Sequence, residues 1–440
     1  MRLSNSSIST RRRGLVIALL AASWAYCAGA AAQTLGKADQ AVLKAAADHR
    51  KPYLDDLKSL VEFETGSRDT EGINQATAWL ADRFKSIGAQ VELIEPVEAN
   101  TYRMIDTPDK IGRMVKATFT GTGSKKILLI AHIDTVYTKG MTLQQPFRID
   151  GNKAYGLGIA DDKQGVAMVL HVASMLKSIG FAGFGTLTVL VNSDEEISSP
   201  GSREVLAREG SVHDAVMSFE STGLGDAERV ALATAGIAAV ELKVEGRASH
   251  AGSAPERGVN ALYELSHQIL QMRDMSVPST GVKLNWTVAQ SGSNRNVIPA
   301  YATAVADVRV LKVSDYDGIE AAVRERVKKQ LLSESKITVN FERRRPPLEV
   351  VDTNRKLATQ VQAVYAELGR TLAVGLQAEG GGTDAAFAAL RTKAPVIERM
   401  GLQGFGAHSN NSEYVLLDTL EPRLYLATRM VMDLSKGLGL

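Results

Sequence analysis

Five side chains able to bind a metal ion or move a proton stand at the ends of apolar runs in this 440-residue chain. His132 and Asp134 follow the first run, Glu195 and Glu196 follow the second, and Glu220 ends the third. In an open α/β sheet, ligands bind beyond the carboxyl ends of the strands. We therefore expect these five side chains to meet at one edge of a sheet.

Two further side chains complete a set with the chemistry of a metal site. Asp161 follows a glycine-containing turn at 156–160, and His408 lies in the segment 404–409. Imidazole and carboxylate ligands suit zinc, but one catalytic zinc ion takes only three protein ligands and a water. Five candidates therefore predict two metal ions that share a bridging carboxylate. The predicted ligands are His132, Asp161, Glu196, Glu220 and His408.

Two carboxylates beside these ligands are expected to have roles other than metal binding. Glu195 precedes a predicted ligand without being one, which is the position of a general base for an attacking water. Asp134 lies two residues after His132 and can accept a hydrogen bond from the far nitrogen of its imidazole, fixing the tautomer. Of the other histidines, we expect His171 and His267 to be packing or surface residues and His213 to be a surface residue.

The elements that position these residues follow from the hydrophobic pattern. Continuous apolar runs at 127–131, 187–191 and 215–219 are typical of strands buried on both faces of a largely parallel sheet. Helical spacing of apolar residues lies before, between and after them. This alternation predicts an α/β catalytic domain with a mostly parallel sheet. The predicted helices are 39–63, 72–88, 164–178, 201–209, 353–368 and 419–435.

The segment 234–344 has a different order of elements. Strand and helix patterns follow one another there as βαββαβ, which is the order of a ferredoxin-like unit. We interpret this unit as a domain inserted into the catalytic domain, whose two parts are then 33–233 and 345–440. The first part follows a short leader at 1–32.

The leader has the composition of a secretory signal peptide. Arg11 to Arg13 precede a short apolar run, and small residues near Ala32 offer a cleavage site. The run is shorter than the roughly 20 residues of a membrane-spanning helix, so we expect export to the periplasm or medium rather than anchoring. A Sec or a twin-arginine route remains open. Cleavage removes four Arg and Cys27, so the net charge changes from +2 to −2 and disulfides are excluded.

Several motifs together resemble one enzyme family. These are His132-Ile133-Asp134-Thr135-Val136, Gly158-Ile159-Ala160-Asp161-Asp162-Lys163, Asp194-Glu195-Glu196, Ala248-Ser249-His250-Ala251-Gly252, Asn296-Val297-Ile298-Pro299, Gly380-Gly381-Gly382-Thr383-Asp384 and Gly404-Phe405-Gly406-Ala407-His408-Ser409. The chain resembles the co-catalytic zinc aminoacylase/carboxypeptidase family from about residue 45 to 435, and its bacterial glutamate carboxypeptidases in particular. The resemblance implies hydrolysis of the amide bond to a C-terminal amino acid, with glutamate expected, from a folate, an acyl group or a peptide.

The resemblance also implies particular roles. Asp161 would bridge two Zn²⁺, with His132 and Glu220 completing one site and Glu196 and His408 the other. Glu195 would be the general base, and a cis peptide would join Asp161 to Asp162. The inserted domain would be a lid and would form a homodimer, in which His250 stabilises the oxyanion at the partner's site. Asn296 and Arg345 would hold the terminal carboxylate of the substrate.

Some substrate contacts are also expected on physical grounds. The planar fork of an arginine suits a substrate carboxylate, and Arg309 is the rival of Arg345 for this role, although we favour a structural salt bridge for it. The glycine loop ending at Gly382 allows backbone to approach a ligand closely, and Thr383 with Asp384 is expected to cap the next helix.

Three alternatives remain at this point. The same family contains N-acyl-amino-acid amidohydrolases and dipeptidases. A protein of another class, an exported solute-binding protein, is also two-domain but needs no His and Glu metal set. An inactive hydrolase fold that only binds zinc would not need Glu195. The near-neutral net charge does not favour nucleic acid or a membrane surface as a partner.

Overall fold

The computed structural model describes residues 36–222, 227–409 and 412–440. The predicted signal peptide, with Cys27, lies outside the described residues. None of the helices in the described ranges is long and apolar enough to cross a membrane.

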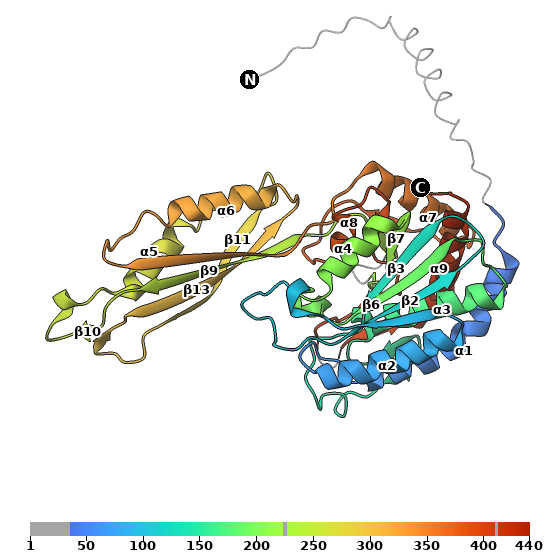
Figure 1. The fold of residues 1–440 in the computed structure, drawn as a ribbon, viewed down its shortest axis with the longest axis horizontal. Coiled ribbons are helices and arrows are strands. Elements are labelled where there is room, and N and C mark those ends of the chain that lie inside the picture. Colours follow the sequence, from blue (N-terminus) through green and yellow to red (C-terminus); the bar gives the residue numbers. More distant parts are fainter. Residues whose placement is uncertain (1–35, 223–226, 410–411) are drawn as a thin grey trace, which may run out of the picture. The chain divides into compact units, whose positions relative to one another are not determined.

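A six-stranded mixed sheet forms the centre of the catalytic domain (Figure 1). Its strand order is β1-β2-β6-β3-β7-β16. The pairs among β6, β3, β7 and β16 are parallel, as expected, whereas β1 and β2 add an antiparallel edge. In sequence order the strands are β1 Gln90–Ile94, β2 Met114–Thr120, β3 Lys126–His132, β6 Thr186–Asn192, β7 Ala215–Ser218 and β16 Val396–Ile397.

Successive residues of the central strands are buried on opposite faces, which explains their unbroken apolar sequence. Ile127 and Leu129 of β3 join one hydrophobic core, and Leu128 and Ile130 join the other. Figure 1 shows α1 and α3 on one side of the sheet and α4 and α8 on the other. The helices are α1 Gln40–Glu62, α2 Thr70–Ser86, α3 Gln164–Ser178, α4 Arg203–Val212, α7 Asp352–Ala366, α8 Ala385–Ala389 and α9 Leu420–Ser435.

The inserted segment folds into the predicted ferredoxin-like unit. Its sheet is antiparallel with the order β11-β13-β9-β14, and α5 and α6 cover one face around a separate core. Helix α6 ends at Arg326. The elements are β9 Gly236–Glu245, α5 Ala261–Gln271, β11 Lys283–Ser291, β13 Tyr301–Val310, α6 Asp315–Arg326 and β14 Lys336–Arg345.

Several short strands escaped prediction because their sequences are brief and not continuously apolar. They form small sheets at the rim of the catalytic domain and in the inserted unit. They are β4 Arg148–Asp150, β5 Lys153–Tyr155, β8 Arg229–Ala231, β10 Ser249–His250, β12 Val297–Ile298, β15 Ala373–Gly375, β17 Gly404–Phe405 and β18 Tyr414–Leu416.

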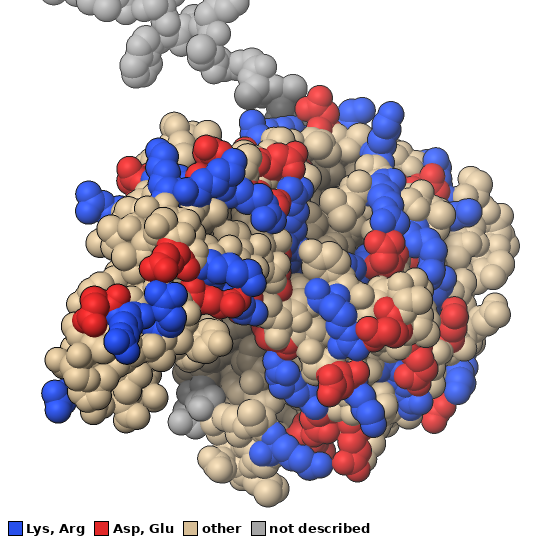
Figure 2. Space-filling view, turned by 60° about the vertical axis from the view of Figure 1, so that its left-hand side comes forward, with Lys and Arg blue, Asp and Glu red and all other residues tan. Residues whose placement is uncertain are grey.

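One histidine away from the sheet edge does not lie where we expected it. His213, expected at the surface, is buried because its two ring nitrogens lie 2.6 Å from Glu209 O and 2.8 Å from Thr188 Oγ1. At the surface seen in Figure 2, acidic and basic side chains are interspersed.

Candidate active site

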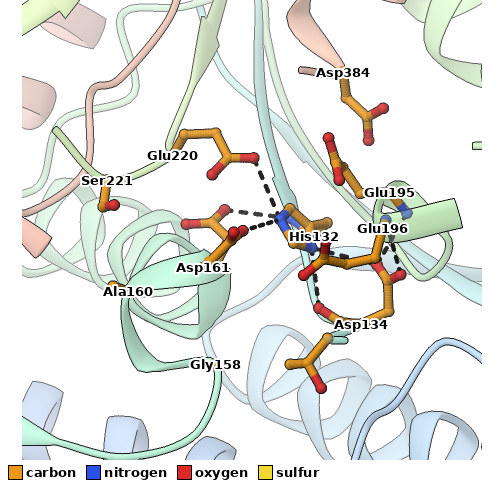
Figure 3. Close-up of polar contacts among 12 residues, drawn as sticks. His132, Asp134, Gly158, Ala160, Asp161, Glu195, Glu196, Glu220, Ser221 and Asp384 are labelled. Carbon is orange, nitrogen blue, oxygen red and sulfur yellow. Dashed lines mark hydrogen bonds and ion pairs between the residues drawn. The ribbon is translucent and has the colours of Figure 1, made fainter. Parts of the chain in front are cut away.

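The structure brings the five predicted metal ligands together at the carboxyl edge of the central sheet. Figure 3 shows His132, Asp161, Glu196 and Glu220 of this group. His132 ends β3 and Glu220 follows β7. Asp161 lies in the turn Ile159–Lys163, where its own backbone is not helical (φ −132°, ψ 86°), after Gly158 with φ +70°. Glu196 lies in the one-turn 3-10 helix Glu195–Ile197, and His408 lies in the loop after β17.

Asp161 stands between the two histidines. Its Oδ1 is 3.0 Å from His132 Nε2, and its Oδ2 is 3.2 Å from His408 Nε2. Glu220 Oε1 lies 3.3 Å from the same His132 nitrogen, and Glu196 Oε2 lies 3.1 Å from the His408 nitrogen. The side chains thus fall into two groups joined by one carboxylate. The Asp161-Asp162 peptide is cis, as the family resemblance implied.

The donor set fits divalent cations. Two groups of three residues each place their ligand atoms within 4.8 Å of one another. One group is His132, Asp162 and Glu220, and the other is Asp161, Glu196 and His408. Asp162 is fully buried and accepts a hydrogen bond from Gln164 Nε2 at 2.6 Å, so we assign the shared position to Asp161, which lines the cavity. Glu196 Oε1 is buried without a hydrogen-bond partner, as a ligand oxygen awaiting a cation would be.

The electrostatics point the same way. Burial raises the pKa of Glu196 to about 7, and the negative charge of Asp161 adds to this. Hydrogen bonds to Asp161 and Glu196 raise the pKa of His408 to about 11. Burial alone would raise the pKa of Asp161, but hydrogen bonds from His132 and His408 hold it below its usual value. Metal ions bound by these groups would displace protons from them.

Asp134 connects His132 to the segment that carries Glu195. Its Oδ1 lies 3.3 Å from His132 Nδ1, and its main-chain oxygen lies 3.1 Å from the same nitrogen. Its carboxylate also accepts the backbone N–H of Glu195 at 3.0 Å and of Glu196 at 3.1 Å. The predicted orienting role is therefore supported by geometry, and it extends to two further site residues.

Glu195 is held by Arg345. Arg345 Nη1 lies 2.8 Å from Glu195 Oε1 and 2.9 Å from Asp384 Oδ1, and Nη2 donates to Glu195 O at 2.6 Å. Asp384 in turn accepts from Ser199 Oγ and from Asn192 Nδ2. Burial raises the pKa of Glu195 well above its usual value, and the positive charge of Arg345 opposes this. Arg345 is thus paired within the protein, which the sequence did not reveal.

Glu413 is a site residue that sequence reasoning missed. Its carboxylate accepts the backbone N–H groups of Gly158 at 2.9 Å, Ala160 at 2.8 Å and Asp161 at 3.1 Å, and the hydroxyl of Tyr137. It therefore fixes the turn that presents Asp161. The only available signal was an acidic residue five positions after His408, which spacing alone does not distinguish from a surface glutamate.

A cavity of about 950 Å³ opens over the cluster. Gly382 and Thr383, the predicted substrate contacts, line it. A Cβ at Gly382 would come within 2.4 Å of Arg345 Cδ, so the absent side chain makes room for that arginine. The Thr383 hydroxyl is buried and has no hydrogen-bond partner among the described residues. Asp384 makes no capping hydrogen bond to α8, contrary to expectation, because its carboxylate is used by Arg345 and Asn192.

His250 and Asn296 do not line this cavity. They lie on and beside the short β10–β12 pair of the inserted unit, and both are exposed. His250 Nδ1 accepts backbone N–H groups of Gly252 and Ser253, each at 3.1 Å. Arg309, the rival carboxylate clamp, lines the cavity but pairs with Asp307 at 2.9 Å, as we favoured.

A mostly parallel α/β sheet with a histidine–carboxylate cluster at its carboxyl edge, a neighbouring acid and a ferredoxin-like insertion defines a metal-dependent hydrolase. The sequence model of Peptidase family M20/M25/M40 matches residues 128–433. The chain belongs to this family of metallopeptidases, and the alternative of a solute-binding protein is not supported.

Similar proteins agree with this assignment. The chain is 41% identical to "Carboxypeptidase G2" of Pseudomonas sp. (strain RS-16), over 97% of this chain and 98% of that protein. It is 26% identical to "N-acetyl-L-citrulline deacetylase" of Xanthomonas campestris pv. campestris over 61% of this chain and 69% of that protein. A crystal structure of an M20 family metallo-carboxypeptidase from Sulfolobus solfataricus has the same fold, with a TM-score of 0.69 at 15% identity over 86% of this chain and 98% of that chain.

Proposed function

We propose that this enzyme is a zinc-dependent exopeptidase that hydrolyses the amide bond to a C-terminal amino acid, with glutamate preferred. The observation that carries the proposal is the Asp161 carboxylate, whose two oxygens face His132 and His408 while Glu195 stands beside them. The similarity to Carboxypeptidase G2 supports the direction of cleavage. A shorter match to a p-aminobenzoyl-glutamate hydrolase homologue of Haemophilus influenzae, 30% identical over 104 residues, supports glutamate.

We assign the metal positions to two Zn²⁺ per subunit. Asp161 would be shared, with His132 and Glu220 on one side and Glu196 and His408 on the other. When bound, the metal ions would polarise the amide carbonyl and make a water more acidic. The mixture of imidazole and carboxylate groups among these five side chains suits zinc.

The residues of the chain then carry the proton transfers. Glu195 takes a proton from the attacking water while the water oxygen forms a bond to the amide carbon. The carbon–nitrogen bond then breaks, and Glu195 returns the proton to the leaving nitrogen, so an acid and a free amine are formed. Its burial and raised pKa favour a carboxyl group that can hold that proton between the two steps.

Arg345, Gly382 and Thr383 form our proposed contact to the terminal carboxylate of the substrate. The Thr383 hydroxyl is unpartnered, and Arg345 is already positioned in the cavity. A substrate carboxylate would compete with Glu195 for Arg345, so substrate binding would release Glu195 from its ion pair. Charge-assisted bonds of this kind are the stronger ones in proteins.

We propose that a second subunit supplies His250, for the oxyanion, and Asn296, for the carboxylate. Both side chains are exposed, and neither lines the cavity of its own chain. The inserted unit offers an edge strand, β11, and exposed apolar residues on α5, including Tyr263 and Leu270. Such features are typical of an interface between copies.

We also propose export through a cleaved signal peptide at 1–32, from the sequence alone. Sequencing the N-terminus of the protein recovered from the periplasm or medium tests this. A protein that keeps residue 1 and stays in the cytoplasm would contradict it.

A second candidate activity is the removal of an acyl group from an N-acyl amino acid, or cleavage of a dipeptide. The similarity to the deacetylase of Xanthomonas campestris favours the first of these. Both reactions use the same cluster and differ in the group that occupies the cavity.

A hydrolysis screen decides between these candidates. The zinc-loaded enzyme would be given folate, 4-aminobenzoyl-glutamate, glutamyl dipeptides and N-acetyl amino acids, with a chelator-treated sample and an E195Q variant as controls. We expect release of C-terminal glutamate that is lost in both controls. Hydrolysis of N-acetyl amino acids alone would favour the second candidate, and chelator-resistant activity would contradict both.

A further inference from the structure

One arginine of the active-site cavity, Arg399, forms no ion pair with a carboxylate of the described residues, although it interacts electrostatically with the buried carboxyl group of the neighbouring Glu398. Four arginines line this cavity: Arg309, Arg344, Arg345 and Arg399. Arg309 forms an ion pair with Asp307. Arg344 pairs with Asp106 and Glu342. Arg345 pairs with Glu195 and Asp384. Within the described residues, no carboxylate lies within ion-pair distance of the Arg399 guanidinium, whose single hydrogen bond runs from Nη1 to Ser221 O at 2.9 Å.

The backbone of Arg399 is held in an unusual conformation. Its φ is +68°, a left-handed value that arginine seldom adopts. The Arg399 N–H donates to Glu398 Oε1 at 2.8 Å, and the Arg399 carbonyl accepts from Arg423 Nη1 at 3.4 Å. The next residue, Met400, donates to Ser218 O of β7 at 2.9 Å. The main chain is thus fixed beside the strand that leads to Glu220.

Left-handed residues cluster around this cavity. Among the described residues, the non-glycine positions with positive φ are Ser198, Ser199, Arg399 and His408. Ser198 and His408 line the cavity with Arg399, and Ser199 bonds to Asp384. Backbone conformations of this kind are strained for residues other than glycine and are found most often at functional sites. Arg399 therefore shares the conformational signature of the site residues.

Arg399 and Arg345 lie at different ends of the metal-ligand cluster. Arg345 binds Glu195 and Asp384, and Arg399 binds the carbonyl of Ser221. In Figure 3, Ser221 is on the left of the cluster and Glu195 and Asp384 are on the right, with Asp161, Glu220 and His132 between them. A substrate lying across the cluster would present one group to each arginine.

We propose that Arg399 binds a second carboxylate of the substrate, distinct from the terminal carboxylate that Arg345 would hold. This inference rests on the proposed function and adds a specificity residue to it. An unpaired guanidinium can form a bidentate ion pair with a carboxylate but gains little from a neutral group. The second carboxylate belongs either to the side chain of the released residue or to the acyl half of the substrate.

Two matched substrate pairs distinguish these sources. 4-Aminobenzoyl-glutamate and 4-aminobenzoyl-glutamine differ only in the charge of the released side chain. N-succinyl-leucine and N-butyryl-leucine differ in a carboxylate on the acyl half. We expect the wild-type enzyme to favour the charged member of one pair, and R399Q to lose roughly 10- to 100-fold in kcat/KM for that member, mainly through KM. The neutral member should change little, and R399K should restore part of the preference.

Controls separate this inference from folding and from the proposed function. R391Q makes the same substitution at an exposed arginine outside the cavity and should behave as wild type. Calorimetric binding to the zinc-loaded protein, of free glutamate against glutamine and of succinate against butyrate, gives a readout for each source of the carboxylate that needs no turnover. Hydrolysis of none of the substrates would contradict the proposed function, and calorimetry would still decide the role of Arg399. Discrimination in R399Q equal to that of wild type, in both turnover and binding, would overturn the inference.

Discussion

The candidate residues of the catalytic domain and those of the inserted unit are held in very different ways. His132, Asp134 and Glu195 are at most 8% exposed, and each makes contacts to other site residues. His250 and Asn296 are exposed, and they are held by local main-chain contacts around the short β10–β12 pair. The catalytic-domain part of the proposed site is therefore held in place by contacts within the chain. The part on the inserted unit would be completed only by contact with a second subunit.

The difference shows what each half requires. A cluster of carboxylates at a sheet edge must be fixed by other buried groups, because unpaired buried charges are costly. A side chain that would serve a neighbouring subunit must stay accessible and needs no such support. The following variants test whether this division is real.

The largest effect is expected inside the catalytic domain, in E195Q. The variant keeps the shape of the side chain but cannot take a proton, so kcat should fall by about 10²- to 10⁴-fold. Zinc content, measured by atomic emission on the purified protein, should stay at the wild-type level because Glu195 is not among the proposed ligands. Wild-type turnover with full zinc would contradict its role as the base.

The inserted unit is tested by H250A, for which we expect a fall in kcat of about 10²- to 10³-fold. Co-expression of H250A with E195Q adds the decisive result. A hybrid dimer then contains one site with both Glu195 and a partner's His250, so about a quarter of wild-type activity should return. No recovery, in preparations shown to contain hybrid dimers, would mean that His250 does not act across an interface.

A smaller effect is expected where one buried group supports another. E413Q places an amide nitrogen against backbone N–H donors of the turn that carries Asp161. Zinc affinity should fall by about 10- to 100-fold, as it does when groups that orient metal ligands are lost. Competition with a chromophoric chelator measures this, with E71Q at an exposed glutamate as the matched control. Unchanged affinity would show that the turn holds without Glu413.

The smallest effect concerns a buried polar network away from the cavity. His49 Nδ1 lies 2.9 Å from His171 Nδ1, and His171 Nε2 lies 3.1 Å from Asp56. Burial and the charge of His171 lower the pKa of His49 to about 4. Because the unfolded histidine titrates near 6.5, stability is full above that pH and is lost as the pH falls toward 4.

H49Q should remove this loss. His49 is only partly buried, so solvent screening reduces the effect. At pH 5 we expect the free energy of unfolding of H49Q to fall by about 1 kcal/mol less than that of wild type, relative to pH 7. Thermal unfolding of chelator-treated wild type and variant at pH 7 and pH 5 measures it, and activity at pH 7 should be unchanged. An equal fall in Tm for both proteins would show that His49 does not carry the pH dependence.

Much of the fold was accessible from the sequence because it depends on local pattern. The buried strands appeared as continuous apolar runs, and α3 occupies the predicted residues 164–178. The convergence of His132, Glu195 and Glu220 followed from the rule for strand ends. The antiparallel edge β1–β2 did not, because Gln90–Ile94 alternates polar and apolar residues and gives no buried run.

The supporting contacts were not accessible, because they join residues far apart in the chain. Glu413 reaches Gly158 across more than 250 positions, and Arg345 reaches Glu195 across 150. Nothing in the spacing of such residues distinguishes a buried acceptor from a surface charge. Side-chain networks of this kind become visible only when the fold places their members together.

The carboxylate of Asp134 contacts the imidazole of His132 and the main chain of Glu195 and Glu196 at once. A displacement of that single group would tilt a proposed zinc ligand and move the proposed proton acceptor in the same event. Natural variation at position 134 would consequently change cofactor retention and turnover together, so neither property could be tuned there without the other.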